Sequence, residues 1–240
     1  MTASQTVEMS ERVSGKKLLL AIGAAILTAA LIGAASFYSL RAIIGHNSAL
    51  VAQIVTLLVY LTLAGTLCAF FRPPTAFPIS FRFTGITSAL AAIGMLAGTM
   101  AAIVLVYYCL GSIFGSVPSV FRQITAFATD AKRLPNQSPI VWSVAIIRGC
   151  VMVPIFEEVF FRGLLLGWLK QHMKQDLAVV TMAALFAVEH GSFVVAHYVF
   201  LFAVSTGYVR LRTSSTFNTV IMHSLNNVML LWLGLRIFHA

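Results

Sequence analysis

The stretch FTGITSALAAIGMLAGTMAAIVLVYYCLGSIFGSVPSVF, residues 83–121, contains no Asp, Glu, Lys or Arg. The hydrocarbon core of a bilayer is about 30 Å thick, so a helix needs roughly 20 apolar residues to cross it. Segments 18–40, 42–71, 191–209 and 213–235 are also free of these charged residues. The sequence therefore predicts several membrane-spanning helices.

Two further apolar segments carry the few charges that the spans contain. Residues 134–170 are apolar apart from Arg148, a cluster at 157–162 and the terminal Lys170, and residues 177–190 form a shorter apolar run that ends with Glu189 and His190. Together with the charge-free segments they predict about seven spans. The number becomes eight if 139–170 divides at Pro154, because proline interrupts helix hydrogen bonding.

The composition of the chain agrees with a membrane protein. Hydrophobic residues make up 59% of the 240 residues and charged residues only 10%, which exceeds the apolar share of a soluble domain. Closed β-barrels also satisfy every backbone group in lipid, but they need alternating segments of about ten residues. Because these runs are continuously apolar, we predict an all-α, polytopic membrane helical bundle.

The domain organisation follows from the length of the loops. Residues 1–15 are polar, and we expect them to be disordered, whereas residues 16–240 predict a single transmembrane domain because no loop is long enough for a second one. The first apolar run follows Lys16-Lys17, as in a cleaved signal peptide. It is long enough to span, so we interpret it as a retained helix.

The formal net charge of +9 is spread over short loops between the spans. These residues form no single basic face that could bind a nucleic acid. The positions of Lys and Arg indicate the membrane topology instead, because both residues are enriched in cytoplasmic loops. A cytoplasmic N-terminus and seven spans place nine of them inside: Arg12, Lys16, Lys17, Arg72, Arg82, Lys170, Lys174, Arg210 and Arg212. Five then lie outside: Arg41, Arg122, Lys132, Arg133 and Arg236. We therefore expect a protein of the bacterial cytoplasmic membrane with its N-terminus inside and its C-terminus outside.

Acidic residues in the apolar segments are the strongest sign of function. Of the seven Asp and Glu residues, Glu157, Glu158 and Glu189 lie in apolar surroundings. An unpaired charge at this depth costs several kcal/mol, so such residues usually serve chemistry or transport.

The first cluster is PIFEEVFFRG, residues 154–163. At about 100° per residue, Glu158 and Arg162 lie about 40° apart on one helix face and can form an ion pair. Glu157 points about 100° away from Glu158, so we expect its carboxylate to face a cavity. The alternative is a purely structural ion pair, with Glu157 at a solvated rim.

Two further clusters contain histidine. Phe186 and His190 lie in LFAVEHG, residues 185–191, while His223 and Asn227 lie in the middle of the last apolar run. His223 and Asn227 are four residues apart, so both side chains face one direction, as donors to a developing oxyanion must. The structural alternatives are a packing histidine and a polar clamp between helices.

The ordered set Glu-Glu-x-x-x-Arg, Phe-x-x-x-His and His-x-x-x-Asn resembles the CPBP family of intramembrane endopeptidases. That family includes the type II CAAX prenyl proteases and the bacterial Abi or bacteriocin-processing proteins. The resemblance covers about residues 141–233, and GYVRLRTS at 207–214 also looks like the family's connection between the last two motifs. The first half of the chain is similar only as generic membrane helices.

The resemblance implies peptide-bond hydrolysis within the bilayer. Glu157 would be the general base acting on water, and His190 would bind and orient that water. His223 and Asn227 would stabilise the tetrahedral oxyanion. A carboxylate with a pKa raised by desolvation is a suitable base, because water is a poor nucleophile at neutral pH.

The resemblance also bears on the supporting residues and the cofactor. Glu158 and Arg162 would be a supporting pair. Glu157, His190 and His223 could instead hold a divalent metal such as zinc with one open position, although the H-E-x-x-H spacing of soluble zinc proteases is absent. We favour a reaction without metal or other cofactor, on a membrane-associated peptide or protein of which CAAX-type substrates are one candidate class.

Two other functions place polar residues in membrane helices. A transporter would require interrupted segments at corresponding positions of two halves, and the first half has no counterpart to the three clusters. A non-catalytic family member, serving as an immunity or scaffold protein, would be free to lose motif residues. None is lost in this chain.

Overall fold

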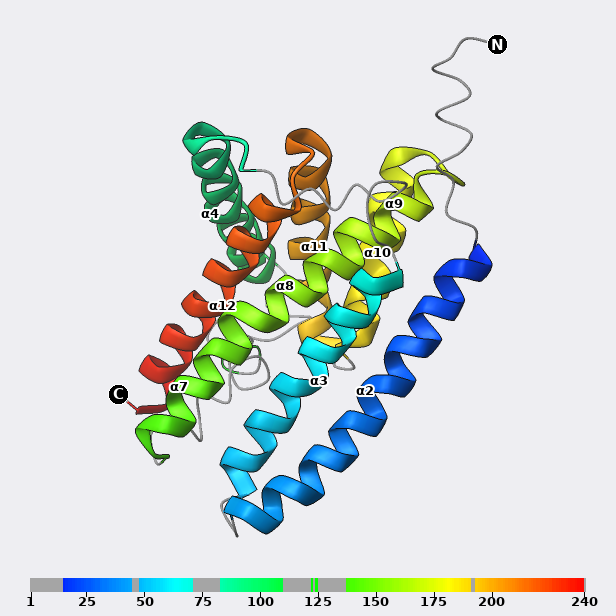
Figure 1. Ribbon diagram of the computed structural model, residues 1–240. Helices are drawn as coiled ribbons and strands as arrows, with labels where there is room; N and C mark the ends of the chain where they lie inside the picture. Colours follow the sequence, from blue (N-terminus) through cyan, green and yellow to red (C-terminus); the bar gives the residue numbers. More distant parts are fainter. Residues whose placement is uncertain are drawn as a thin grey trace. The chain divides into compact units, whose positions relative to one another are not determined.

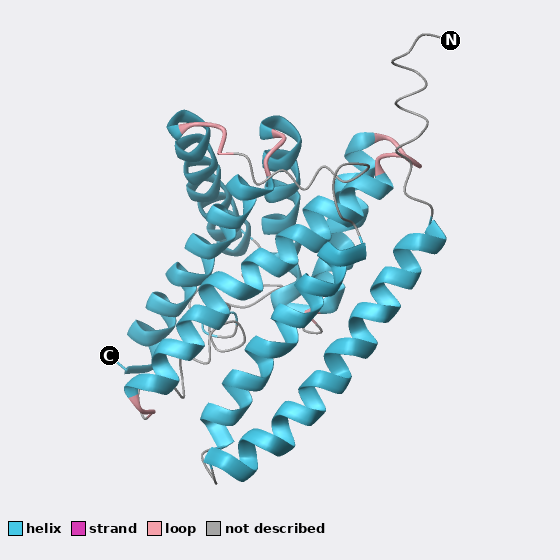
Figure 2. Ribbon diagram, viewed as in Figure 1, coloured by secondary structure: helices cyan, strands magenta, loops and turns pink. Residues whose placement is uncertain are grey.

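The computed structural model describes residues 15–44, 48–70, 83–109, 122, 124, 137–190 and 193–239. Within these ranges every regular element is a helix and no strand occurs (Figure 2). The predicted all-α class is therefore confirmed. The polar N-terminal segment, up to residue 14, lies outside the described residues.

The helices are labelled in Figure 1. In the first half of the chain they are α2 (Gly15–Ile44), α3 (Ser48–Phe70) and α4 (Ile86–Cys109). The second half holds α7 (Pro139–Ile147), η2 (Arg148–Met152), α8 (Val153–Glu157), η3 (Glu158–Leu165), α9 (Leu166–Leu169), α10 (Gln175–Glu189), α11 (Phe193–Thr213) and α12 (Thr216–His239).

Four helical segments of the described chain are long and apolar enough to cross a membrane. They are Leu19–Ile43, Ile86–Cys109, Pro139–Leu169 and Thr216–Ile237. Helix α10 has only 15 residues and is therefore about 22 Å long, shorter than a bilayer core. The chain is an integral membrane protein, and the number of seven spans stays a prediction.

The segment Pro139–Leu169 is helical throughout and does not divide at Pro154. Ser138 caps its start, because the Ser138 hydroxyl accepts a hydrogen bond from the backbone N–H of Val141 at 3.5 Å. The helix begins with Pro139, and proline is common at the first position of a helix. A proline ring clashes with the carbonyl four residues earlier. Here that carbonyl lies in η2, where π-helical bonding widens the turn and the Val153 N–H donates to the Arg148 carbonyl.

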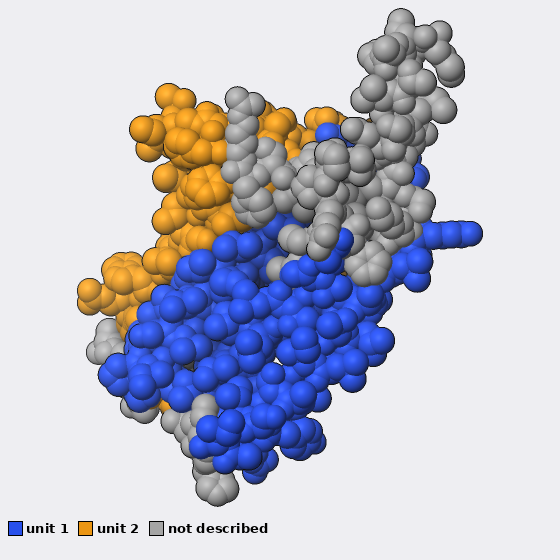
Figure 3. All heavy atoms as spheres, in the orientation of Figure 1, with its two compact units in different colours: residues 1–78, 138–172 blue, residues 79–137, 173–240 orange. Residues whose placement is uncertain are grey.

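The described residues fall into two compact units, coloured separately in Figure 3. The first comprises Met1–Pro78 and Ser138–His172. In it α2 and α3 lie side by side (Figure 1). Helix α3 also contacts α7, η2 and α8. A Cβ on Gly33 would come within 2.9 Å of Val59 Cγ2, so glycine allows the close approach of α2 and α3. The single domain predicted for residues 16–240 stays a prediction.

The second unit comprises Ile79–Gln137 and Met173–Ala240. Helix α11 is its centre, in contact with α4, α10 and α12. Apolar side chains from α4, α11 and α12 form its buried core: Ala92, Leu96, Phe202, Val209 and Met222. Side-chain hydrogen bonds also link segments of this unit, among them those from Thr99 to Ser205 at 2.8 Å and from Asn218 to Thr84 at 2.9 Å. Such polar contacts tie helices together where no hydrophobic force drives their association in lipid.

The turn between α11 and α12 consists of two serines. Ser214 adopts a φ of 51°, the left-handed conformation that commonly ends helices and is favourable mainly for glycine. Ser215 then caps α12 by accepting from the backbone N–H of Asn218 at 3.4 Å. This short connection sets the start of the helix that carries His223 and Asn227.

Candidate active site

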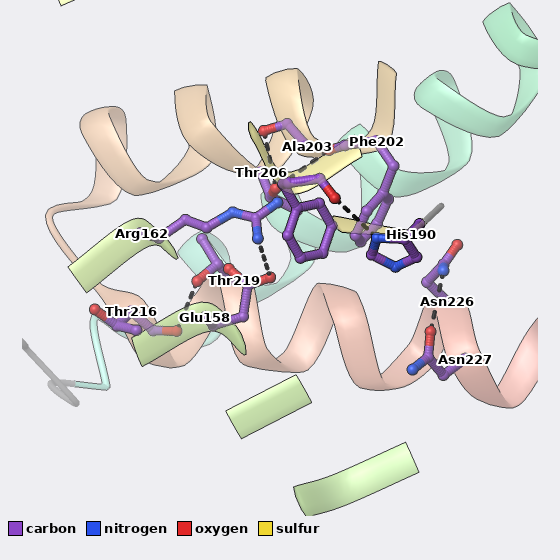
Figure 4. A network of polar contacts seen from close by, with 11 residues as sticks. Glu158, Arg162, His190, Phe202, Ala203, Thr206, Thr216, Thr219, Asn226 and Asn227 are labelled. Atoms are coloured by element: carbon purple, nitrogen blue, oxygen red, sulfur yellow. Dashed lines mark hydrogen bonds and ion pairs between the residues drawn. The ribbon is translucent and has the colours of Figure 1, made fainter. Parts of the chain in front are cut away.

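The Glu-Glu-x-x-x-Arg motif lies where the helix changes from α to π geometry. Glu157 is the last residue of α8 and Glu158 the first of η3. Glu158 Oε1 and Arg162 Nη1 are 3.1 Å apart, and both side chains have no exposed surface. The ion pair expected from the sequence is present in the structure (Figure 4).

Glu157 is also buried, with 7% of its surface exposed. The structure therefore does not place it at a solvated rim. Moving two charges out of water costs several kcal/mol each, and pairing with Arg162 offsets this for Glu158. The first unit thus holds two adjacent buried carboxyl groups, and one of them forms an ion pair with an arginine.

Aromatic rings surround this motif. Phe156 and Phe160 are stacked with centroids 6.3 Å apart, and Phe160 meets Phe161 edge-on at 4.9 Å. Tyr60 of α3 packs against Phe156 at 5.4 Å. Sequence reasoning did not find Tyr60, because its contact with the motif arises only when α3 packs on α8.

The second motif places His190 at the C-terminal end of α10. Its Nδ1 lies 2.8 Å from the backbone carbonyl oxygen of Phe186. A carbonyl can only accept, so Nδ1 carries the hydrogen and donates it. In the neutral ring Nε2 then holds a lone pair, which can accept a hydrogen bond from water or ligate a metal.

Phe186 joins the two histidines of the second unit. Its ring lies edge-to-face with His190, at 4.8 Å between centroids, and with His223, at 6.1 Å. Phe202 of α11 contacts the His223 ring at 5.2 Å. Edge-to-face packing fixes ring orientation as well as position. The phenylalanine of the Phe-x-x-x-His motif therefore has a structural role that spacing alone did not reveal.

The third motif lies on α12. His223 is buried, with 5% exposed, while Asn227 is half-buried one turn further along. Asn226, which the motif does not include, donates from its amide to Asn227 Oδ1 at 3.3 Å (Figure 4). The structure thus brings together Glu158 with Arg162, His190 with His223 through Phe186, and Asn226 with Asn227.

Glu189 and His197 are ionisable residues of the second unit that do not join these contacts. Glu189 is exposed at the end of α10, although the sequence had placed it in apolar surroundings. His197 is half-buried in α11. Within each unit, the described residues include no group of three or more His, Cys, Asp or Glu side chains that could hold a metal ion.

The comparisons with known proteins agree with the motifs. Residues 139–229 match the family model described as type II CAAX prenyl endopeptidase, Rce1-like. This range contains all three motifs and nearly coincides with the 141–233 of the resemblance. No curated protein and no solved structure matches the chain significantly. Residues 139–229, the part that carries every candidate catalytic residue, are therefore similar to the Rce1-like type II CAAX prenyl endopeptidase family.

Proposed function

We propose that this protein is an intramembrane endopeptidase that hydrolyses a peptide bond of a membrane-associated peptide or protein by means of a water activated by glutamate and histidine. The observation that carries the proposal is the family match, because it includes the three motifs in order. Two observations support the mechanism. Glu157 is buried next to the Glu158–Arg162 ion pair, and His190 donates from Nδ1 to the Phe186 carbonyl, which puts the lone pair of the neutral ring on Nε2.

In this mechanism the carboxylate of Glu157 takes a proton from water while His190 Nε2 orients the same water. The hydroxide oxygen bonds to the scissile carbonyl carbon, and the negative charge develops on the carbonyl oxygen. His223 and Asn227 donate to that oxygen. When the C–N bond breaks, the proton passes from Glu157 to the leaving amine, so base and acid are the same group.

The family name suggests the substrate class, a protein ending in a prenylated Cys-a-a-X sequence. A substrate anchored by a prenyl chain would reach a buried carboxylate from within the lipid. The alternative of a non-catalytic immunity or scaffold protein predicts binding without turnover, and a transporter predicts movement of a solute across vesicles.

The test uses full-length protein reconstituted in lipid vesicles with synthetic peptides that end in Cys-a-a-X, prenylated or unprenylated, and mass spectrometry of the products. We expect release of the C-terminal peptide from prenylated substrates only, and its loss in Glu157→Gln. The matched control is Asp176→Asn, which neutralises an exposed carboxylate at the start of α10. Cleavage that survives in Glu157→Gln would refute the general base, and binding of these peptides without any product would favour the non-catalytic alternative.

A further inference from the structure

A chain of two hydrogen bonds reaches Asn227 from the neighbouring helix. The Tyr198 hydroxyl of α11 donates to Asn226 Oδ1, and Asn226 Nδ2 donates to Asn227 Oδ1 at 3.3 Å. Tyr198 and Asn226 are almost fully buried, with 2% and 3% exposed. All three residues belong to the second unit. Neither Tyr198 nor Asn226 belongs to the three motifs.

The direction of these bonds follows from the chemistry of the groups. A phenol has one proton, and the acceptors near the Tyr198 hydroxyl include the Asn226 amide oxygen and, at 3.5 Å, Met100 Sδ. A carbonyl oxygen is a much stronger acceptor than a thioether, so the proton goes to Asn226. The oxygen and nitrogen of an amide lie on opposite sides of its carbon. Once Tyr198 binds the oxygen of Asn226, its NH₂ group faces Asn227.

The same reasoning determines how Asn227 is presented. Because its Oδ1 accepts from Asn226, its own NH₂ group is directed away from Asn226. An oxyanion requires a donor, and an amide rotated by a half-turn would offer it a carbonyl oxygen, which repels it. The hydrogen bond from Asn226 therefore favours the orientation in which the Asn227 amide can donate to an oxyanion.

We infer that Tyr198 and Asn226 are positioning residues, which hold the Asn227 amide with its N–H donors toward the developing oxyanion. This inference rests on the proposed function, in which Asn227 is an oxyanion donor. Their contribution lies in the transition state, because a neutral ground-state carbonyl gains less than an oxyanion from a fixed donor. Their loss should therefore lower kcat and leave KM nearly unchanged.

The experiment measures kcat and KM for the prenylated peptide, together with thermal unfolding, on full-length protein in vesicles. We expect Tyr198→Phe, which keeps the ring and removes the hydroxyl, to lower kcat by about 10-fold to 100-fold. This is the loss of rate expected when a catalytic group is slightly misplaced. Asn226→Leu, which has the same branching but no polar atoms, should do the same. The matched control is Thr99→Val, which removes the α4–α11 hydrogen bond to Ser205 in the same unit. It should lower the unfolding temperature without changing kcat.

A double-mutant cycle separates positioning from general stabilisation. In an Asn227→Ala background the group to be positioned is missing, so Tyr198→Phe should lower kcat no further. An equal drop in both backgrounds, or a loss of unfolding temperature with kcat unchanged, would overturn the inference. If Asn227→Ala itself leaves kcat unchanged, the oxyanion role in the proposed function is wrong and the inference falls with it. If Asn227→Ala lowers kcat and Tyr198→Phe does not, only the positioning role is wrong.

Discussion

Glu157 and Glu158 are adjacent buried glutamates, and Glu158 forms an ion pair with Arg162. Glu158 is fully buried against Arg162, 3.1 Å away. Glu157, at the end of α8, is also buried, and adjacent residues of a helix point about 100° apart. A buried ion pair depends on both members, since removing one leaves an uncompensated charge. Replacing the two side chains should therefore have different effects on stability and on activity.

Replacing each glutamate by glutamine tests this division. Glu158→Gln leaves the Arg162 charge without its carboxylate, and we expect the free energy of unfolding to fall by about 3–5 kcal/mol. Glu157→Gln should abolish cleavage and leave unfolding near normal. Denaturant unfolding in detergent and the peptide cleavage assay measure the two effects. Equal losses of stability with equal residual activity would contradict the separate roles.

The histidines distinguish a glutamate-based mechanism from a metal-based one. If His223 is only an oxyanion donor with Asn227, His223→Ala and Asn227→Ala should each lower kcat by about 10²–10³ and leave residual activity. Purified protein should also stay active after exhaustive chelation. Zinc at one equivalent per chain, lost together with all activity in His190→Ala and His223→Ala, would make the protein a metalloprotease instead.

At the scale of elements, the rod from Pro139 to Leu169 combines α-helical and π-helical turns. The π turns η2 and η3 lie on either side of the five-residue helix α8, which contains Pro154 and ends at Glu157. π-helical bonding is rare, and it occurs frequently at functional sites. The wider turn relieves the clash at Pro154 and so keeps the rod continuous. The motif glutamates consequently lie at a change of helix geometry.

Close packing of α10 on α11 fixes the elements that carry His190 and Phe202. A Cβ on Gly207 would meet Val179 Cγ1 at 2.9 Å and Met182 Cε at 3.1 Å. Valine is stiff and both neighbours are fully buried, so we expect Gly207→Ala to destabilise the protein by about 1–3 kcal/mol. A Cβ on Gly98 of α4 would meet nothing within 4 Å, so Gly98→Ala should be neutral or slightly stabilising. Thermal unfolding of both variants checks this, and equal changes would contradict it.

At the scale of the whole molecule, apolar side chains on the surface agree with a lipid environment. Helix α2 alone exposes Leu19, Leu27 and Leu31 by more than 60%. Large aromatic residues lie exposed near the ends of three helices, Tyr38 in α2, Tyr108 in α4 and Trp232 in α12. Tyr and Trp are enriched where a membrane meets water, and Arg236 lies 5.5 Å from the Trp232 ring centroid. Exposed aromatic residues of this kind are typical of a membrane interface.

The distribution of Lys and Arg predicts which side each loop faces. We expect single cysteines at Gln171 and Arg212, both exposed, to react with a membrane-impermeant maleimide only in inside-out vesicles of a cysteine-free variant. A cysteine at Arg236, predicted to lie outside, is the matched control and should react in intact cells. Labelling of residues 171 and 212 in intact cells would reverse the predicted orientation of α7–α9.

The sequence by itself determined the class of the protein and the identity of its motifs. Long runs without charge exclude a soluble domain, because a helix in lipid must satisfy its own backbone and present apolar side chains. The pairing of Glu158 with Arg162 was also predictable, since both residues lie four apart on one helix. Such features depend on neighbours along the chain, and local periodicity is enough to find them.

Tertiary structure decided what depends on contacts between distant segments. Tyr60 reaches the glutamate motif from α3, and Phe202 reaches His223 from α11. The Tyr198 hydroxyl reaches Asn226 across 28 positions of sequence. The π turns around Pro154 also had no signature in a pattern based on α-helical spacing. Helix packing selects these partners by shape and hydrogen-bond geometry, and neither is encoded in the periodicity of a single helix.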